Sequence, residues 1–411
     1  MRDSVAWLYG LQTHGIKLGL DGIRALLALL DHPEDGLSIA LVGGTNGKGS
    51  VAAMLDAMLA AHGRRSGLYT SPHLVRPEER IRIEGADIAS PVFDGIVARV
   101  RSAAEQLETH PSFFEVMTAA ALVAFREVKV GDVVLEVGLG GRLDATNVTE
   151  PRVSAVVTVD LDHVAVLGHT LPAIAAEKAA IARPGRPLVS GVTQDEAIAV
   201  LRTHCASIGA TFLDARATPL PEPLTLTLDG EHQRANARVA VATLRAFAEA
   251  SGFRVDEARI RQGLAGTRWP GRLHEIAGAP AVLLDGAHNA AGAEALARHL
   301  ATRPGPRPVL VFAAMADKDA TAILAPLVPV VASVVTTRPP VERAADPSML
   351  ADLARSLGVP AEPRADPLAA VARAREEAGA TGTVLVAGSL YLVGAVLALL
   401  EEPGAPGPIS M

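Results

Sequence analysis

The chain of 411 residues is long enough for two domains, each with its own hydrophobic core. Hydrophobic residues make up 49% of it and charged residues 20%, a balance typical of a globular α/β protein. The net charge of -7 argues against a nucleic-acid-binding surface, and a single cysteine, Cys205, excludes an intrachain disulfide and fits a reducing, cytoplasmic compartment. The N-terminus lacks a signal-peptide pattern, and the apolar stretch 391–400 is too short to span a membrane, so we expect a buried terminal helix there.

Short β-branched runs alternate with Ala- and Leu-rich helical stretches, the pattern of βαβ units that form a parallel sheet. The clearest strands of the first series are expected at 38–43, 132–138 and 154–160. A second series is expected at 281–286, 308–315, 333–338 and 383–388. Glycines and a proline near Thr267 mark the boundary, while the Pro-rich span 215–223 is a loop of the first domain. We therefore predict a P-loop-type parallel-sheet ATPase domain (1–267) followed by a smaller Rossmann-like α/β domain (268–411).

A glycine-rich turn joins the first strand to a helix expected at 51–63, the context of a phosphate-binding loop. Such a loop turns backbone N–H groups and a helix N-terminus toward an anion, while a lysine reaches the terminal phosphates. The spacing departs from the strict pattern, because Val42 stands where a glycine is expected and Gly49 separates Lys48 from Ser50. The second departure weakens the case for Ser50 as a magnesium ligand. The alternative is a glycine-rich turn that binds no nucleotide. The predicted ATP-binding residues are Gly44, Thr45, Asn46, Gly47, Lys48, Gly49 and Ser50.

Three polar residues lie where predicted strands of the first domain end. Glu136 closes one strand, His163 follows another, and Ser71 follows the short run 66–70. The carboxyl ends of parallel strands border one crevice, so these side chains and phosphate oxygens together provide an octahedral magnesium site. Singly, each has an ordinary structural interpretation. Lys178, on a predicted helix, reads from its sequence alone as a surface lysine that would repel a metal.

A series of short motifs runs through almost the whole chain, in the order found in one known family. They are GTNGKGS (44–50), TSPHL (70–74), FFE (113–115), LEVGLGGRLDATN (135–147), LDH (161–163), EK (177–178), HQ..NA (232–237), PGR (270–272), DGAHN (285–289) and GS (388–389). With them the chain resembles the folylpolyglutamate synthase/dihydrofolate synthase family of the Mur ligase group. The resemblance implies an ATP-dependent ligase with two Mg²⁺ ions, and a Lys178 that carries a carbamate.

The resemblance also implies individual roles in the first domain. Lys48 holds the ATP phosphates. Ser71 and Glu136 bind one magnesium ion, and His163 and the carbamylated Lys178 serve a second. Carbamylation turns the amine into an anionic oxygen ligand, which removes the objection to a lysine at a metal site.

Further implied roles fall on both domains. Asn236 contacts the adenine, and Arg272 reaches the ATP phosphates. Asp285 and His288 are implied to handle the incoming glutamate, although on their own they fit an ordinary strand-end turn equally well. Whether His288 is a general base or a carboxylate contact stays open.

The pterin-side pocket is implied by the FFE and RLDATN segments together with the SPHL loop, expected to be a flexible wall. Its candidate residues are Phe114, Asp144, Ser71, Pro72 and His73. These segments favour a pocket for dihydropteroate, so both synthase activities are expected, while the preferred folate and the polyglutamate length stay open.

The expected reaction activates a folate carboxylate as an acyl phosphate, which the glutamate amine then attacks, giving ADP and phosphate. The alternatives are another Mur-type amide ligase, a small-molecule kinase, and an ATP-gated binding protein without ligase activity. A cell-wall ligase would normally carry an extra N-terminal domain before the phosphate loop, and a kinase would leave DGAHN and PGR unexplained. The expected partners are small molecules (ATP, L-glutamate, dihydropteroate or reduced folate), with no nucleic acid or membrane, and the expected state is a monomer.

Overall fold

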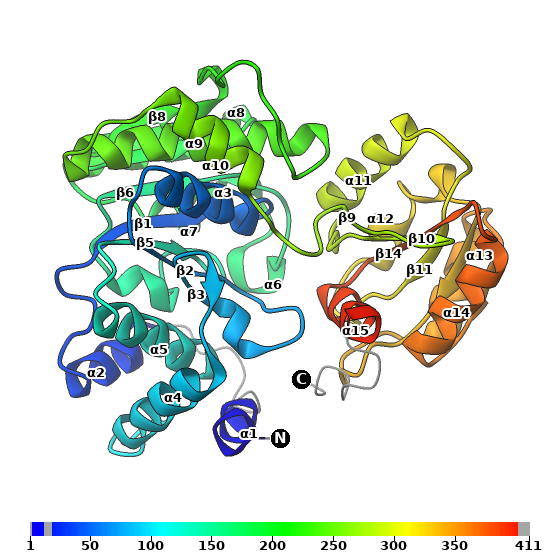
Figure 1. Cartoon of the computed structure of the whole chain (residues 1–411), viewed down its shortest axis with the longest axis horizontal. Helices are drawn as coiled ribbons and strands as arrows, with labels where there is room; N and C mark the ends of the chain where they lie inside the picture. Colours follow the sequence, from blue (N-terminus) through cyan, green and yellow to red (C-terminus); the bar gives the residue numbers. More distant parts are fainter. Residues whose placement is uncertain (1, 12–18, 402–411) are drawn as a thin grey trace. The chain divides into compact units, whose positions relative to one another are not determined.

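The computed structural model describes residues 2–11 and 19–401 (Figure 1). The chain divides into two compact units. The N-terminal unit comprises Met1–His73, Pro77–Thr227 and Gln233–Arg268, and the C-terminal unit comprises Leu74–Arg76, Leu228–His232 and Trp269–Met411. Among the described helices, none combines the length and apolar character needed to cross a bilayer.

The N-terminal unit is built on a sheet of order β4-β3-β2-β5-β1-β6-β7-β8. In this order, all neighbours from β2 to β8 are parallel, whereas the β2–β3 and β3–β4 pairs at one edge are antiparallel. Val42 of the central strand pairs with Glu136, and Gly43 pairs with Val156. The register thus sets Glu136 and the segment after Val156 beside the start of the phosphate loop. The strands are β1 (Ser38–Gly43), β2 (Ser66–Tyr69), β3 (Ile81–Ile83), β4 (Ala86–Asp87), β5 (Asp132–Glu136), β6 (Val153–Val156), β7 (Pro187–Ser190) and β8 (Thr211–Asp214).

Helices cover both faces of this sheet, with α3 and α10 on one side and α4 and α5 on the other (Figure 1). α5 begins at a capping box, because Ser112 Oγ accepts from Glu115 N–H while the Glu115 carboxylate accepts from Ser112 N–H. α3 and α5 are buried on almost every side, as expected for Ala-rich helices inside a large core. The helices are α1 (Asp3–Gly10), α2 (Asp21–Leu29), α3 (Lys48–Ala61), α4 (Ser90–Ala104), α5 (Phe113–Glu127), α6 (Val164–Leu167), α7 (Leu171–Ala179), α8 (Asp195–Ile208), α9 (Glu231–Ser251) and α10 (Glu257–Gly266).

The C-terminal unit has a second sheet, of order β13-β12-β11-β14-β10-β9, in which only β9 is antiparallel to its neighbour. Successive side chains of a strand point to opposite faces, and here both faces are covered. Leu283 and Leu310 enter the core beneath α11, α12 and α13, whereas Val282 and Val309 enter the core beneath α14 and α15. Each strand of this sheet interior is therefore apolar on both faces, which explains why its sequence reads as a continuous apolar run.

The elements of the C-terminal unit follow the Rossmann-like alternation predicted from the sequence. The strands are β9 (His274–Ile276), β10 (Ala281–Leu284), β11 (Val309–Phe312), β12 (Ser333–Thr336), β13 (Ala361–Pro363) and β14 (Thr383–Ala387). The helices are α11 (Ala290–Thr302), α12 (Ala320–Leu324), α13 (Pro347–Ser356), α14 (Pro367–Ala378) and α15 (Leu390–Glu401).

The α/β fold class is confirmed, and the predicted terminal helix is α15, whose Leu392 and Val396 are buried. Most strands are shorter at their carboxyl ends than predicted. The reason is that the predicted ranges included polar or glycine residues that leave the ladder: β6 ends at Val156 rather than at 160, and β10 ends at Leu284 rather than at 286. α3 begins earlier than predicted, at Lys48, because Gly47 occupies its N-cap position.

Candidate nucleotide and ligase site

The phosphate loop turns directly into α3 at Gly47. This residue has φ +81°, a left-handed conformation that favours glycine, and a Cβ there would lie 2.5 Å from Asn236 Oδ1. Gly47 therefore serves two needs at once: it reverses the backbone so that the first N–H groups of α3 point outward, and it leaves room for Asn236. The local sequence thus builds an anion-binding helix N-terminus.

The other side of the loop is fixed by the segment that follows β6. Thr45 N–H donates to Thr158 O (2.9 Å), and Asn46 N–H donates to Thr158 Oγ1 (2.8 Å). Asp160 N–H donates to Thr45 Oγ1 (3.0 Å), and Asn46 Nδ2 donates to Asp160 Oδ2 (3.2 Å). The loop is therefore held in shape before any ligand arrives, which is the preorganisation that phosphate binding requires.

Lys48 folds back over this loop. Its Nζ donates to Gly44 O and to Thr45 O, each at 3.1 Å, so the ammonium lies against the backbone turn. Ser50 lies in the first turn of α3 and is 2% exposed. A phosphate at the loop would meet the cation of Lys48 together with the N–H groups at the start of α3.

Lys178 is not the surface lysine that its sequence alone suggests. It lies in the last turn of α7 and is 2% exposed. Burial, and to a smaller extent the charge of Lys48, lower its pKa from 10.5 to about 7, against the opposing effect of Asp162, Asp160 and Asp144. At neutral pH a large fraction of this amine is therefore unprotonated and nucleophilic.

The structure joins two of the predicted metal ligands directly. Ser71 N–H donates to Glu136 Oε2 at 2.9 Å, and Glu136 is buried at the end of β5. His163 is the N-cap of α6 with φ +50°, its N–H donates to Asp162 Oδ1 (2.8 Å), and its side chain is 40% exposed. No cluster of three His, Cys, Asp or Glu ligands occurs in the described part of the chain.

Phe114, predicted to line the pterin pocket, packs against another aromatic ring. The Phe114 ring lies 6.0 Å from the Tyr69 ring, centroid to centroid, and a Cβ at Gly138 would lie 2.5 Å from Phe114 Cζ. The glycine is thus what lets the LEVGLGG turn pass close to the ring. This contact brings the FFE segment and the segment after Glu136 together.

Asp144 has a structural duty that the sequence did not reveal. Its carboxylate accepts from Leu139 N–H (2.9 Å) and from Thr146 N–H (3.0 Å), which caps the short 3₁₀ helix Ala145–Val148. Burial raises the pKa of Asp144, although the hydrogen bonds from Thr146 and Leu139 oppose this rise. The residue shapes the RLDATN turn, and a contact with a ligand stays a prediction.

The SPHL segment begins with a cis peptide bond between Ser71 and Pro72, and His73 behind it is buried. Arg80 Nε donates to His73 Nδ1 (2.8 Å), so the neutral ring carries its proton on Nε2 and donates to Tyr9 Oη (3.2 Å). Burial and the charge of Arg80 hold the pKa of His73 well below 6.5. In this structure His73 is therefore an interior, hydrogen-bonded residue, whereas the sequence predicted a flexible wall.

The amide of Asn236 is oriented by its neighbour on α9. Asn236 Nδ2 donates to Gln233 Oε1 (2.9 Å), and both residues are buried. Asn236 Oδ1 is consequently the atom turned toward Gly47. The residue predicted to contact adenine therefore lies against the phosphate loop.

The DGAHN turn of the C-terminal unit follows β10. Asp285 accepts from Leu273 N–H (3.0 Å) and Ala287 N–H (2.9 Å), and His288 Nδ1 donates to Gly286 O (2.7 Å). The neutral His288 ring then has its lone pair on Nε2. A Cβ at Gly286 would lie 3.1 Å from Arg272 Nη1, so Arg272, Asp285 and His288 belong to one turn region.

Several residues of these sites were not singled out from the sequence. Thr158 and Asp160 lie inside a range taken as strand, where two polar residues at the end of an apolar run were the available signal. Gln233 is part of the quoted HQ..NA motif but was given no role. Tyr9 and Arg80 had no signal, because their contacts with His73 join distant segments.

Comparison with known proteins supports the sequence resemblance. The family model "Mur ligase, glutamate ligase domain" matches residues 271–390. The chain is 32% identical to the Escherichia coli dihydrofolate synthase/folylpolyglutamate synthase, over 98% of this chain and 96% of that protein. It is 38% identical to a probable bifunctional folylpolyglutamate synthase/dihydropteroate synthase of Haloferax volcanii, over 95% of this chain, and it spans about half (49%) of that protein's length.

A solved structure gives the same result for the fold. The bifunctional folylpolyglutamate synthase/dihydrofolate synthase of Yersinia pestis, complexed with AMPPNP and Mn ion, matches with a TM-score of 0.87 and 30% identity, over 97% of this chain and 98% of that one. Identity of this level over nearly full length accompanies the phosphate loop and the buried Lys178. The chain therefore belongs to the folylpolyglutamate synthase/dihydrofolate synthase family of ATP-dependent ligases, within the Mur ligase superfamily.

Proposed function

We propose that the protein ligates L-glutamate to dihydropteroate and to the γ-carboxylate of tetrahydrofolate and its polyglutamates, with conversion of ATP to ADP and phosphate. The observation that carries the proposal is the buried Lys178 beside a preformed phosphate loop, since its pKa of about 7 gives it chemistry that a P-loop kinase does not need. Residues 1–267 would bind ATP and the folate, and residues 268–411 would handle glutamate.

The donor set fits magnesium. Ser71 Oγ, a carboxylate oxygen of Glu136, His163 and phosphate oxygens supply hard and intermediate ligands, and Ser71 and Glu136 already share a hydrogen bond. When bound, the cation would neutralise charge on the transferring phosphoryl group. We propose two such ions, with Ser71 and Glu136 holding one, His163 and Lys178 serving the other, and Ser50 as a further candidate ligand.

We further propose that Lys178 carries a carbamate. The neutral amine adds to CO₂, its nitrogen forms the new C–N bond, and the released proton leaves to solvent. A pKa near 7 makes this addition feasible at neutral pH, whereas an ordinary lysine would be almost fully protonated. The product is an anion, which also suits the position beside Lys48.

The residues of the chain then divide the steps between them. Lys48 and the N–H groups of the loop hold the phosphates, and Asn236 contacts the adenine. The folate carboxylate attacks the γ-phosphorus, so an O–P bond forms, the bond to ADP breaks, and an acyl phosphate results. The amine of glutamate attacks the acyl carbon, phosphate leaves, and the amine proton passes to a base for which His288 Nε2 is a candidate.

Other residues have binding roles in this proposal. Asp285 and Arg272 would act on the glutamate and on the phosphates, respectively. The pterin side would be bound by a group of residues from three segments of the N-terminal unit: Phe114, Asp144, Ser71, Pro72 and His73. We also propose that the enzyme acts on these small molecules as a cytoplasmic monomer.

The test is ATP-dependent incorporation of labelled glutamate by the purified protein with magnesium, in separate reactions with dihydropteroate and with tetrahydrofolate. Incorporation into both acceptors is expected. Incorporation into tetrahydrofolate alone would restrict the protein to tail extension. ATP binding without incorporation into either acceptor would overturn the proposal and favour a different carboxylate or an ATP-gated binding protein.

A further inference from the structure

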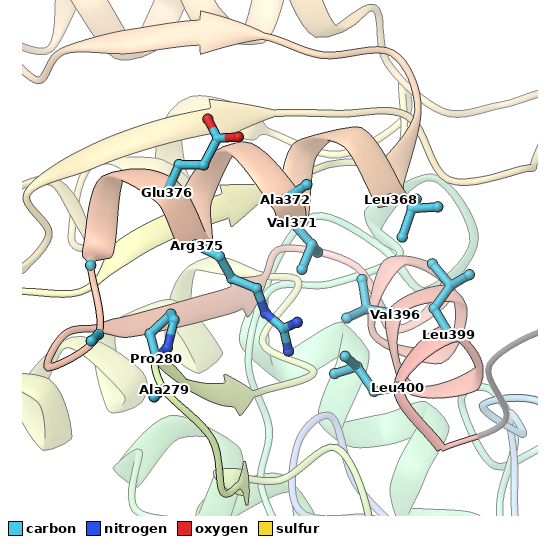
Figure 2. A pocket seen from close by; sticks show the side chains of 12 residues that line it. Ala279, Pro280, Leu368, Val371, Ala372, Arg375, Glu376, Val396, Leu399 and Leu400 are labelled. Carbon is cyan, nitrogen blue, oxygen red and sulfur yellow. The ribbon is translucent and has the colours of Figure 1, made fainter.

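A groove of about 550 Å³ lies in the C-terminal unit between α14, α15 and the loop before β10 (Figure 2). Its lining runs from Leu368, near the start of α14, to Gly379, just beyond its end. Eleven residues of helix correspond to about 16 Å, so the groove is elongated. The cis Ala279–Pro280 segment lies at the opposite wall.

The walls of the groove are mainly apolar. Val371 on α14 faces Val396 and Leu400 on α15 across it (Figure 2), and Leu368 at one end is 55% exposed. Apolar surface left in water in this way is unfavourable, and an apolar ligand would remove it from water. Shape and polarity therefore select an extended apolar body.

One cation enters this apolar space. The Arg375 side chain points from α14 into the groove (Figure 2), and its Nε is sealed from solvent with no hydrogen-bond partner in the described part of the chain. A buried guanidinium nitrogen without an acceptor is costly. An anion bound in the groove would compensate the charge and supply acceptors for the guanidinium.

The neighbouring carboxylate does not neutralise Arg375. Glu376 is turned away from the Arg375 guanidinium (Figure 2), and its Oε2 lies 3.9 Å from Arg373 Nη1. Arg373 also pairs with Glu362 and, at 3.4 Å, with Glu377. Glu376 belongs to the groove lining, but its carboxylate lies on the Arg373 side, so the charged group that points into the groove is the Arg375 guanidinium.

The groove is distinct from the DGAHN turn. Pro280 precedes β10, whereas Asp285 follows it, so the four-residue strand separates them by about 13 Å. Ligands of parallel α/β sheets bind at the carboxyl ends of the strands, where Asp285 and Ser389 lie. The Pro280 end of the groove lies at the other end of the sheet, and the groove includes none of the residues assigned to the ligase reaction.

We propose that this groove binds a small amphiphilic carboxylate, with its apolar chain along α14 and its carboxylate on Arg375. The proposal is independent of the ligase function. It involves no covalent step, and the ligand class follows from an elongated, mainly apolar groove into which the Arg375 guanidinium points, with its buried Nε lacking an acceptor.

The test is calorimetric titration of the full-length protein with decanoate, and in parallel with 1-decanol, which has the same chain without the charge. Decanoate should bind about tenfold or more tightly than decanol. Arg375→Met should remove that preference and leave decanol binding unchanged. Arg373→Met is the matched control, since it removes the same charge from the same helix outside the groove, and it should leave both affinities unaltered.

A second variant keeps the proposal open to refutation if Arg375→Met does not fold. Ala372 is exposed on the groove wall, and Ala372→Trp should block decanoate and decanol alike while glutamate incorporation stays at the wild-type rate. Equal affinities for decanoate and decanol, or unchanged decanoate binding by Arg375→Met, would overturn the proposal. Binding seen only after removal of residues 402–411 would also overturn it, because it would assign the groove to the chain's own C-terminus.

Discussion

The phosphate loop and the DGAHN turn are both strand-to-helix turns, but their side chains make different kinds of contact. Thr45 is fixed by Asp160, 115 residues later in the chain. In the DGAHN turn, Asp285 bonds to Ala287, and His288 bonds to Gly286, each two residues away. Backbone bonds tie both turns to their sheets, since Asp285 N–H donates to Val386 O and Gly388 N–H donates to Ala287 O. The difference lies in the side chains: those of the phosphate loop bond to a distant segment, whereas most side-chain bonds of the DGAHN turn are local.

Because of this difference, we expect substitutions to affect the two turns in different ways. Damage to a distant residue should weaken the phosphate loop without changing its motif. The DGAHN turn should respond chiefly to changes within the motif itself. Four predictions test or sharpen this contrast.

The largest effect is expected from Lys48→Ala, because it removes the cation that lies against the loop. Glutamate-dependent ADP release should fall by about 100-fold or more. Lys129→Ala, a change of the same type at an exposed position, should leave the rate unaltered. A wild-type rate for Lys48→Ala would remove the phosphate loop from the reaction.

Lys178→Ala should lower the rate by a similar or somewhat smaller factor, with partial recovery on addition of a small carboxylate. In the wild type, carbon NMR should show that the uptake of labelled CO₂ increases with pH, with a midpoint near pH 7. The folded amine loses its proton near pH 7 and the unfolded amine near 10.5, so the unfolded state binds more protons between these values. The unmodified protein should therefore gain stability from pH 7 to 10.5, and a CO₂-uptake midpoint near 10.5 would contradict the burial effect.

Asp160→Ala and Asp285→Ala give the direct comparison between the two turns. Asp160→Ala removes an acceptor of Asn46 and should weaken ATP binding about tenfold, corresponding to about 1–2 kcal/mol. Asp285→Ala should leave ATP affinity unchanged, but it leaves two buried N–H groups without their acceptor and should destabilise the protein by about 1–3 kcal/mol. Titration calorimetry and thermal unfolding separate these outcomes, and equal ATP affinities in both variants would end the contrast.

The smallest effect concerns His73, whose pKa is held well below 6.5 in the folded state. Its stabilisation is complete above pH 6.5 and is lost as the pH falls through the folded pKa, because the unfolded state binds the proton more readily. His73→Gln should therefore lose less stability than wild type between pH 7 and 5, by at most about 1.4 kcal/mol per pH unit. His32 is a control, because Glu34 raises its pKa and its effect on the pH dependence of stability therefore has the opposite sign. Denaturant unfolding at each pH measures the stabilities of the wild type and the variants.

The fold class and both series of βαβ units were predictable because strand and helix periodicity is local. The phosphate loop was predictable for the same reason, since its glycines, its lysine and the following helix are consecutive. Thr158 and Asp160 were not found, because they act through contacts more than 100 residues away. The pKa of Lys178 was also out of reach, because burial depends on the packing of α7 and not on the neighbours of Lys178 in the sequence.

The antiparallel edges show a related limit. The β3–β4 edge and β9 were not predicted, because these strands have only two or three residues and leave little periodicity to detect. Asp144 is a third case. Its sequence is compatible with a ligand contact and with a cap, and only the structure shows that its carboxylate caps a 3₁₀ helix.

The division of each C-terminal strand between two cores has a consequence for how this chain can change length. Deleting one residue within β11 would invert its alternation and exchange Leu310 and Val311 between the cores. The exposed turn 304–307 just before that strand carries no such constraint. Insertions should therefore be tolerated in such turns, both in evolution and in engineered variants. For the same reason, 304–307 is a suitable position for a fused reporter.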